Sequence, residues 1–145
     1  MKESKQLNLA LLLLSAGLIF YIIAGVTPAI ITPSAFTRFC LWFVPIKALI
    51  YAFLIWQIRA EQSWARITTL IIYLLCLVSF LSFAAVFQSF LYNPPSKEVD
   101  FFITHQHAFT VSLIFGSIEK VFETIAIFLL FTKKMNKVFA HKTRS

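Results

Sequence analysis

The chain has 145 residues, of which 59% are hydrophobic and only 13% are charged, whereas soluble domains are about one quarter charged. Its apolar residues lie in long uninterrupted runs, which excludes a disordered chain or a soluble domain and indicates an integral membrane protein. A net charge of +7 would suggest nucleic acid as the partner of a soluble protein. Here the basic residues flank the apolar runs, so we expect a lipid bilayer and no nucleic acid.

The first apolar run extends from Leu7 to Ile31, after a short head that carries Lys2 and Lys5. Its length of about 25 residues exceeds the roughly 7–15 of a signal-peptide core, so we predict a retained transmembrane helix. Pro28 removes the backbone hydrogen bond to the carbonyl of Ala24, which predicts a local bend near the end of this helix.

The second predicted span, from Phe39 to Ile58, follows a short loop from Thr32 to Arg38. It contains Lys47 among apolar residues. Trp42 and Trp56 lie near its two ends, where amphipathic rings favour the membrane interface, so both are predicted to be interface anchors.

The third predicted span, from Ile67 to Tyr92, follows a polar loop from Arg59 to Arg66. Ser63 is a plausible N-cap for this helix. Trp64 and Arg66 are predicted to be interface anchors, with the ring at the level of the lipid headgroups and the cation near lipid phosphate.

The fourth predicted span, from Ala108 to Phe131, follows the longest loop, which begins at Asn93-Pro94-Pro95 and reaches about His107. Each of the four runs can cross a hydrocarbon core of about 30 Å as a helix. Because the connections are short, we predict a single domain, residues 1–145, folded as an antiparallel four-helix transmembrane bundle. The basic segment 132–145 is predicted to be a cytoplasmic tail.

The distribution of Lys and Arg predicts the orientation. The head, the second loop and the tail hold nine of these residues, and the first and third loops hold two, Arg38 and Lys97. By the positive-inside rule, both termini are predicted to lie in the cytoplasm of a plasma (inner) membrane protein.

The segment Gln62-Ser63-Trp64-Ala65-Arg66-Ile67-Thr68, followed by an apolar run, resembles a family of small uncharacterised bacterial membrane proteins with four transmembrane helices. In that family a Trp-Ala-Arg step opens the third helix. The segment from Ile125 to Lys133 is similar as well, so the likeness covers about half of the chain. The resemblance implies the four-helix architecture and no particular activity.

Two charged residues are predicted to lie deep in the membrane. Lys47 lies about 12 Å from the outer end of the second span and Glu119 about 16 Å from the outer end of the fourth. An isolated charge there costs about 2.5–3.5 kcal/mol or more. We therefore expect Lys47 to face Glu119.

Further polar residues lie near this expected pair. Glu123 shares a helical face with Glu119, and Lys120 can reach Glu123 at a spacing of three residues. Tyr51 is one turn from Lys47, and Tyr21 is close enough in depth to reach the group. The set is either a neutral structural ion-pair network or a site for an ion, a proton or a polar ligand.

His105 and His107 are weak candidates for a metal pair at the outer mouth, with Asp100 or Glu98 as further ligands. They share a face on a strand but not on a helix, and no recognisable zinc pattern is present. We predict no cofactor. No span contains a histidine that could hold haem.

Two pairs of residues bear on helix packing. Gly17 and Gly25 predict a close-packing surface on the first helix. Cys40 and Cys76 lie on different helices at different depths, so we expect two free thiols.

These features favour a non-enzymatic membrane protein that acts by binding a membrane protein partner or a second copy of itself, as accessory subunits and immunity proteins do. The alternative is a small oligomeric ion or proton channel, or a transporter, that uses Glu119, Glu123 and Lys47. A membrane enzyme would need a nucleophile or metal at the mouth of the bundle, where only His105 and His107 are available.

Overall fold

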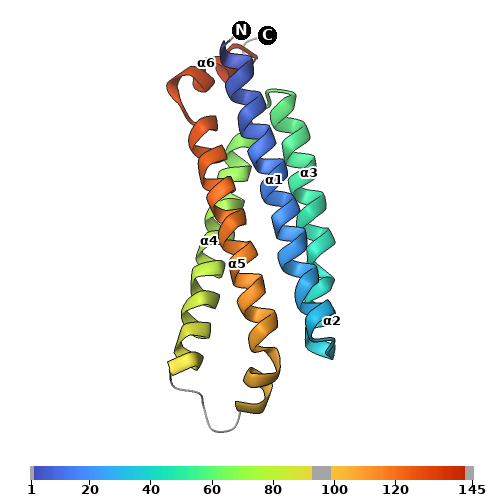
Figure 1. The fold of residues 1–145 in the computed structure, drawn as a ribbon. Helices are drawn as coiled ribbons and strands as arrows, with labels where there is room; N and C mark the ends of the chain where they lie inside the picture. Colours follow the sequence, from blue (N-terminus) through green and yellow to red (C-terminus); the bar gives the residue numbers. More distant parts are fainter. Residues whose placement is uncertain (1, 93–98, 143–145) are drawn as a thin grey trace.

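The computed structural model describes residues 2–92 and 99–142, and all regular structure in these two segments is helical (Figure 1). The helices are α1 (Lys2–Ile31), α2 (Ala35–Leu41), α3 (Phe43–Arg59), α4 (Ser63–Tyr92), α5 (Val99–Leu130) and α6 (Lys133–Lys142). By length and composition, the described segments Lys5–Ile31, Thr37–Arg59 and Ser63–Ser89 could each cross a membrane. The chain is thus all-helical with three long apolar helices, as expected of a membrane protein.

The long helices form a bundle in which α1 packs most extensively against α5 and next against α3. Helix α4 closes the bundle through contacts with α3 and α5. The start of α1, the α3–α4 turn and α6 all lie at one end of the molecule (Figure 1). Many large apolar side chains on the outside are exposed.

The second predicted span is two helices, not one, and the loop predicted from Thr32 to Arg38 is wrong after Ser34. The Ser34 hydroxyl accepts a hydrogen bond from the Thr37 amide at 3.2 Å, and the Thr37 hydroxyl accepts one from the Ser34 amide at 2.9 Å. This capping box starts α2 at Ala35. The chain breaks again at Trp42, because Pro45 has no N–H for the carbonyl of Leu41 and its ring crowds that group.

The other predicted boundaries mark where the apolar runs begin, not where the helices begin. Helix α4 starts at Ser63, so the loop after Arg59 is shorter than predicted. Helix α5 starts at Val99, well before Ala108, because no Pro or Gly stops the helix between Pro95 and Ala108. The predicted stop at Asn93-Pro94-Pro95 lies outside the described residues.

The basic tail folds in part as helix α6, which the sequence prediction missed. Met135 and Phe139, one helical turn apart, are 1% exposed and pack with Leu7, Ala10 and Leu130 in one core cluster. The polar composition of the tail concealed this short apolar face.

A side-chain hydrogen-bond pair joins the start of α1 to the end of α5. The Gln6 amide donates to the carbonyl of Leu129 at 3.1 Å and to the Thr132 hydroxyl at 2.7 Å. Helices α1 and α5 are therefore held together at the end of the bundle where α6 lies.

The predicted close-packing role of Gly17 and Gly25 is confirmed, although each faces a different helix. A Cβ atom at Gly17 would lie 3.4 Å from Cγ of Glu123 on α5. A Cβ atom at Gly25 would collide with the side chain of Val44 on α3. Glycine thus lets α1 approach both neighbours closely.

Pro28 lies inside α1, and the carbonyl that it leaves unpaired has a new partner. The Ser112 hydroxyl of α5 donates a hydrogen bond to the Ala24 carbonyl at 3.1 Å. The proline therefore creates an acceptor that joins α1 to α5. The bend predicted at Pro28 stays a prediction. Cys40 and Cys76 are both free thiols, as predicted.

Candidate functional site

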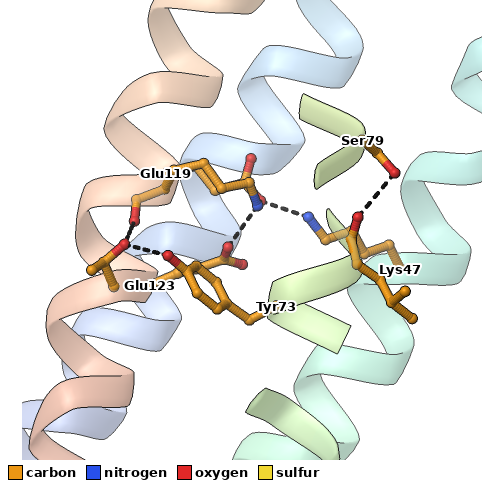
Figure 2. Close-up of polar contacts among 8 residues, drawn as sticks. Lys47, Tyr73, Ser79, Glu119 and Glu123 are labelled. Carbon is orange, nitrogen blue, oxygen red and sulfur yellow. Dashed lines mark hydrogen bonds and ion pairs between the residues drawn. The ribbon is translucent and has the colours of Figure 1, made fainter. Parts of the chain in front are cut away.

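The four charged residues predicted to lie in the membrane form one continuous ion-pair network (Figure 2). Lys47 Nζ lies 2.6 Å from Oε1 of Glu119, which confirms the predicted pair between α3 and α5. Lys120 Nζ lies 3.1 Å from the same Glu119 oxygen and 2.6 Å from Oε2 of Glu123. One carboxylate oxygen is thus shared by two ammonium groups.

The network is deeply buried on the α5 side and more open at Lys47. The exposed fraction of the side chain is 2% for Glu123, 5% for Glu119 and 9% for Lys120, but 18% for Lys47. Buried charges require partners because desolvation is costly, and each member has at least one. Lys47 is therefore the member of the network that a solute could reach most readily.

Two tyrosines surround the Lys47 ammonium group. Its Nζ lies 3.9 Å from the ring centroid of Tyr21 on α1 and 5.2 Å from that of Tyr51 on its own helix. Both distances suit a cation–π interaction. The Tyr51 hydroxyl is buried near Glu123 but outside hydrogen-bonding geometry. Tyr21, which the sequence placed only by depth, is thus part of the site.

A cavity of about 350 Å³ adjoins this network between α1, α3, α4 and α5. Lys47, Glu119 and Lys120 line it, whereas Glu123 does not. The remaining wall is made of small, hydroxyl-bearing and apolar residues from α1, α4 and α5: Tyr21, Ala24, Gly25, Leu75, Cys76, Ser79, Phe80, Phe83, Ser112 and Gly116. The charges therefore border a pocket that opens at the surface of the bundle, where Leu75, Ser79 and Phe83 are exposed.

Glycine contributes to the cavity by bringing α4 over α5. A Cβ atom at Gly116 would lie 2.8 Å from Cε2 of Phe80, so glycine lets this ring lie against α5 without a shift. A second contact is polar, since the Tyr73 and Thr124 hydroxyl oxygens are 2.6 Å apart (Figure 2). Thr124 in turn donates to the carbonyl of Lys120 at 2.6 Å.

The α4 wall was not predicted, although the sequence contains a signal for it. Tyr73, Cys76, Phe80, Phe83 and Phe87 are spaced by three and four residues in turn, which places them along one helical face. Tyr73 and Phe87 are buried, whereas Cys76, Phe80 and Phe83 line the cavity. Because this helix is apolar on all sides, the heptad spacing of these residues indicates which of its faces lines the cavity, and hydrophobicity alone does not.

The residues predicted to be interface anchors differ in their surroundings. Trp42, Trp56 and Trp64 are exposed, so their contact with lipid headgroups stays a prediction. Arg66 instead contacts protein, because its guanidinium donates to the Leu130 carbonyl at 3.1 Å and to Asn136 Oδ1 at 2.7 Å.

The rings of Phe131 and Phe139 each lie 4.7 Å from the Arg66 guanidinium carbon. Together with the two hydrogen bonds, these contacts make Arg66 a clamp between α4, the end of α5 and α6. The predicted contact of Arg66 with lipid phosphate stays a prediction.

The weak metal candidates are not brought together. His105 and His107 lie on helix α5 and not in a loop, so their side chains leave the helix in different directions. His105 is buried and lies 3.0 Å from the Ser34 hydroxyl, whereas His107 is exposed. Glu98 and the Asp100 side chain lie outside what the structure describes. Among the described side chains, no three potential ligands gather as a metal site requires.

No protein-family model, curated protein or solved structure matches this chain. The resemblance to small bacterial four-helix membrane proteins therefore stays a prediction.

Proposed function

We propose that the chain is a multi-pass protein of the plasma (inner) membrane that crosses the bilayer four times, with α5 as the fourth span and both termini in the cytoplasm. Helix α5 has 32 residues, which is about 48 Å at 1.5 Å per residue. Unlike the three apolar helices, α5 carries charged residues near its middle, Glu119, Lys120 and Glu123. These side chains are buried and paired, so they do not prevent α5 from crossing the bilayer. The excess of basic residues in the head, second loop and tail supports the orientation.

Within this topology, we propose that the protein binds a small polar or charged solute in the central cavity and moves it across the membrane. The observation that carries the proposal is the cavity of about 350 Å³ lined by Lys47, Glu119 and Lys120. Binding pockets for small molecules have volumes in this range and combine apolar walls with few polar groups. A purely structural ion-pair network would need no adjoining space.

A cavity-filling substitution tests this proposal. Ser79 and Ser117 are both exposed serines whose hydroxyls bond only to the preceding turn of their own helix. Ser79 lines the cavity and Ser117 does not. We expect Ser79→Trp to remove solute uptake by proteoliposomes and Ser117→Trp to retain it. Uptake of small anionic, cationic and neutral solutes that is no faster than in protein-free liposomes would reject the proposal, as would equal loss in both variants.

A second candidate function is binding of a membrane protein partner or a second copy. The surface of α4 favours it, because α4 buries the smallest share of its residues among the three apolar helices. Leu74, Val78 and Leu81 lie exposed along it. Cross-linking from a cysteine placed at Val78 in native membranes tests this candidate, with Val121 on α5 as the control. If both positions cross-link equally, and to lipid and not to protein, this candidate function is excluded.

A further inference from the structure

The cavity wall offers more hydrogen-bond donors than acceptors at its charged end. Each lysine ammonium group has three N–H donors. Lys47 directs one of them to Glu119, and Lys120 directs two, to Glu119 and Glu123. About half of the ammonium donors in the described network therefore have no protein acceptor. Since Glu123 is not part of the wall, two ammonium groups and one carboxylate face the space, which suits a solute with an anionic oxygen.

The rest of the wall indicates the kind of anion. Leu75, Phe80 and Phe83 of α4 form an apolar surface within the same cavity. The volume of about 350 Å³ far exceeds the roughly 30 Å³ that one water molecule occupies in the liquid, so the cavity has room for a solute larger than a simple inorganic ion. An organic anion with one charged group and a small apolar body matches both parts of the wall.

The charge balance of the network adds a condition. With two ammonium groups and two carboxylates, the network is neutral before any solute enters. An additional carboxylate would leave one negative charge uncompensated in a low-dielectric interior, which is costly. Entry of one proton removes that charge, and Glu119 is the carboxylate that lines the cavity.

We propose that the cavity binds a small organic monocarboxylate together with one proton, and that Glu119 accepts the proton. This inference rests on the proposed solute-binding function. A proton from the aqueous phase forms an O–H bond with the Glu119 carboxylate, and the ion pairs of Glu119 with Lys47 and Lys120 are lost. The solute carboxylate then takes the place of Glu119 at Lys47, while Lys120 keeps Glu123. Each ammonium group again faces one anion, and the overall charge is zero.

The groups around Glu119 are compatible with this exchange. Lys47 and Tyr51 approach from α3, Lys120 and Glu123 from α5, Tyr21 from α1 and Cys76 from α4. Lys47 is more exposed than Lys120, so Lys47 is the ammonium group that can exchange its partner. Tyr21 holds the Lys47 ammonium in place through its ring during the exchange.

Lactate binding to the purified protein in detergent tests the proposal by calorimetry between about pH 5.5 and 7.5, where lactate stays ionised. If binding takes up one proton, the apparent Kd rises about tenfold per pH unit above the protonation point. Glu119→Gln, which mimics the protonated residue, should bind lactate with an affinity that does not vary with pH. The double variant Lys47→Met/Glu119→Gln, in which neither partner is left unpaired, should fold and bind no lactate.

The outcomes separate this inference from the proposed function. Lactate binding that is independent of pH in the wild type, or unchanged in the double variant, would overturn the inference. Propylammonium binding in place of lactate would overturn it too, but would leave solute binding intact. If neither probe binds and the cavity-filling variant behaves as the wild type, both the inference and the proposed function fail.

Discussion

At the residue scale, Glu119 is the centre of the site because one of its oxygens accepts from two lysines. The pairing of Lys47 with Glu119 could be predicted because both residues lie at similar depth and an unpaired charge in the membrane is costly. The contact between Lys120 and Glu119 could not be predicted from spacing, since neighbouring residues on a helix do not face each other. Flexible lysine side chains overcome that geometry, so a sequence pattern predicts the members of a charge cluster better than its connections.

A double-variant cycle measures how strongly this pair stabilises the fold. Glu119→Gln leaves Lys47 without an anionic partner, and Lys47→Met leaves Glu119 with Lys120 alone, so that the network is no longer neutral. Loss of one partner of a buried pair costs about 3–5 kcal/mol, whereas removal of both can be nearly neutral. We therefore expect each single variant to lower the Tm in detergent and the double variant to recover most of the loss.

Glu123→Gln serves as the control in this cycle. Lys120 keeps Glu119 as a partner when Glu123 loses its charge, so the decrease in Tm should be smaller than for Glu119→Gln. Single Lys47 and Glu119 variants as stable as the wild type would show that the ion pair does not support the fold.

At the element scale, the number and order of the long helices could be predicted from the apolar runs, whereas their ends could not. Hydrophobicity marks where a helix is surrounded by lipid, but a helix continues into polar sequence until a proline or a cap stops it. For this reason His105 and His107 lie on α5, although the sequence predicts them in the preceding loop. Helix α6 was missed because its apolar face consists of few residues in a basic segment.

The close approach of α1 and α3 gives a test at this scale. Gly25→Ala should lower the Tm because the new methyl group would collide with the side chain of Val44, and overpacking costs about 1–3 kcal/mol. Gly17→Ala is the matched control on the same helix, since its Cβ atom would meet its nearest neighbour at 3.4 Å, an ordinary contact distance. We expect Gly17→Ala to be nearly neutral.

Removing the obstacle should reverse the effect at Gly25. In the variant Gly25→Ala/Val44→Ala the methyl group has room, and we expect thermal unfolding to return toward that of Val44→Ala alone. If Gly25→Ala and Gly17→Ala have the same Tm, the interface between α1 and α3 is not as close as described.

At the scale of the whole molecule, the orientation in the membrane is open to a direct test. A single cysteine at Ser96, in a background without Cys40 and Cys76, should react with an impermeant thiol reagent in intact cells. A cysteine at Ser145 should react only after the cells are made permeable. This result is expected because nine basic residues lie on the side of the termini and two on the other. The reverse labelling pattern would contradict the predicted topology.

The packing of α6 against the start of α1 has a consequence for how the protein is made. Leu7 and Ala10 are synthesised early, but the side chains that cover them, Met135 and Phe139, leave the ribosome only after the four long helices. The cytoplasmic end of the bundle in the proposed topology therefore stays open during translation and insertion. A ribosome that stalls before α6 would release a chain with this apolar cluster uncovered, a form that chaperones and membrane proteases recognise.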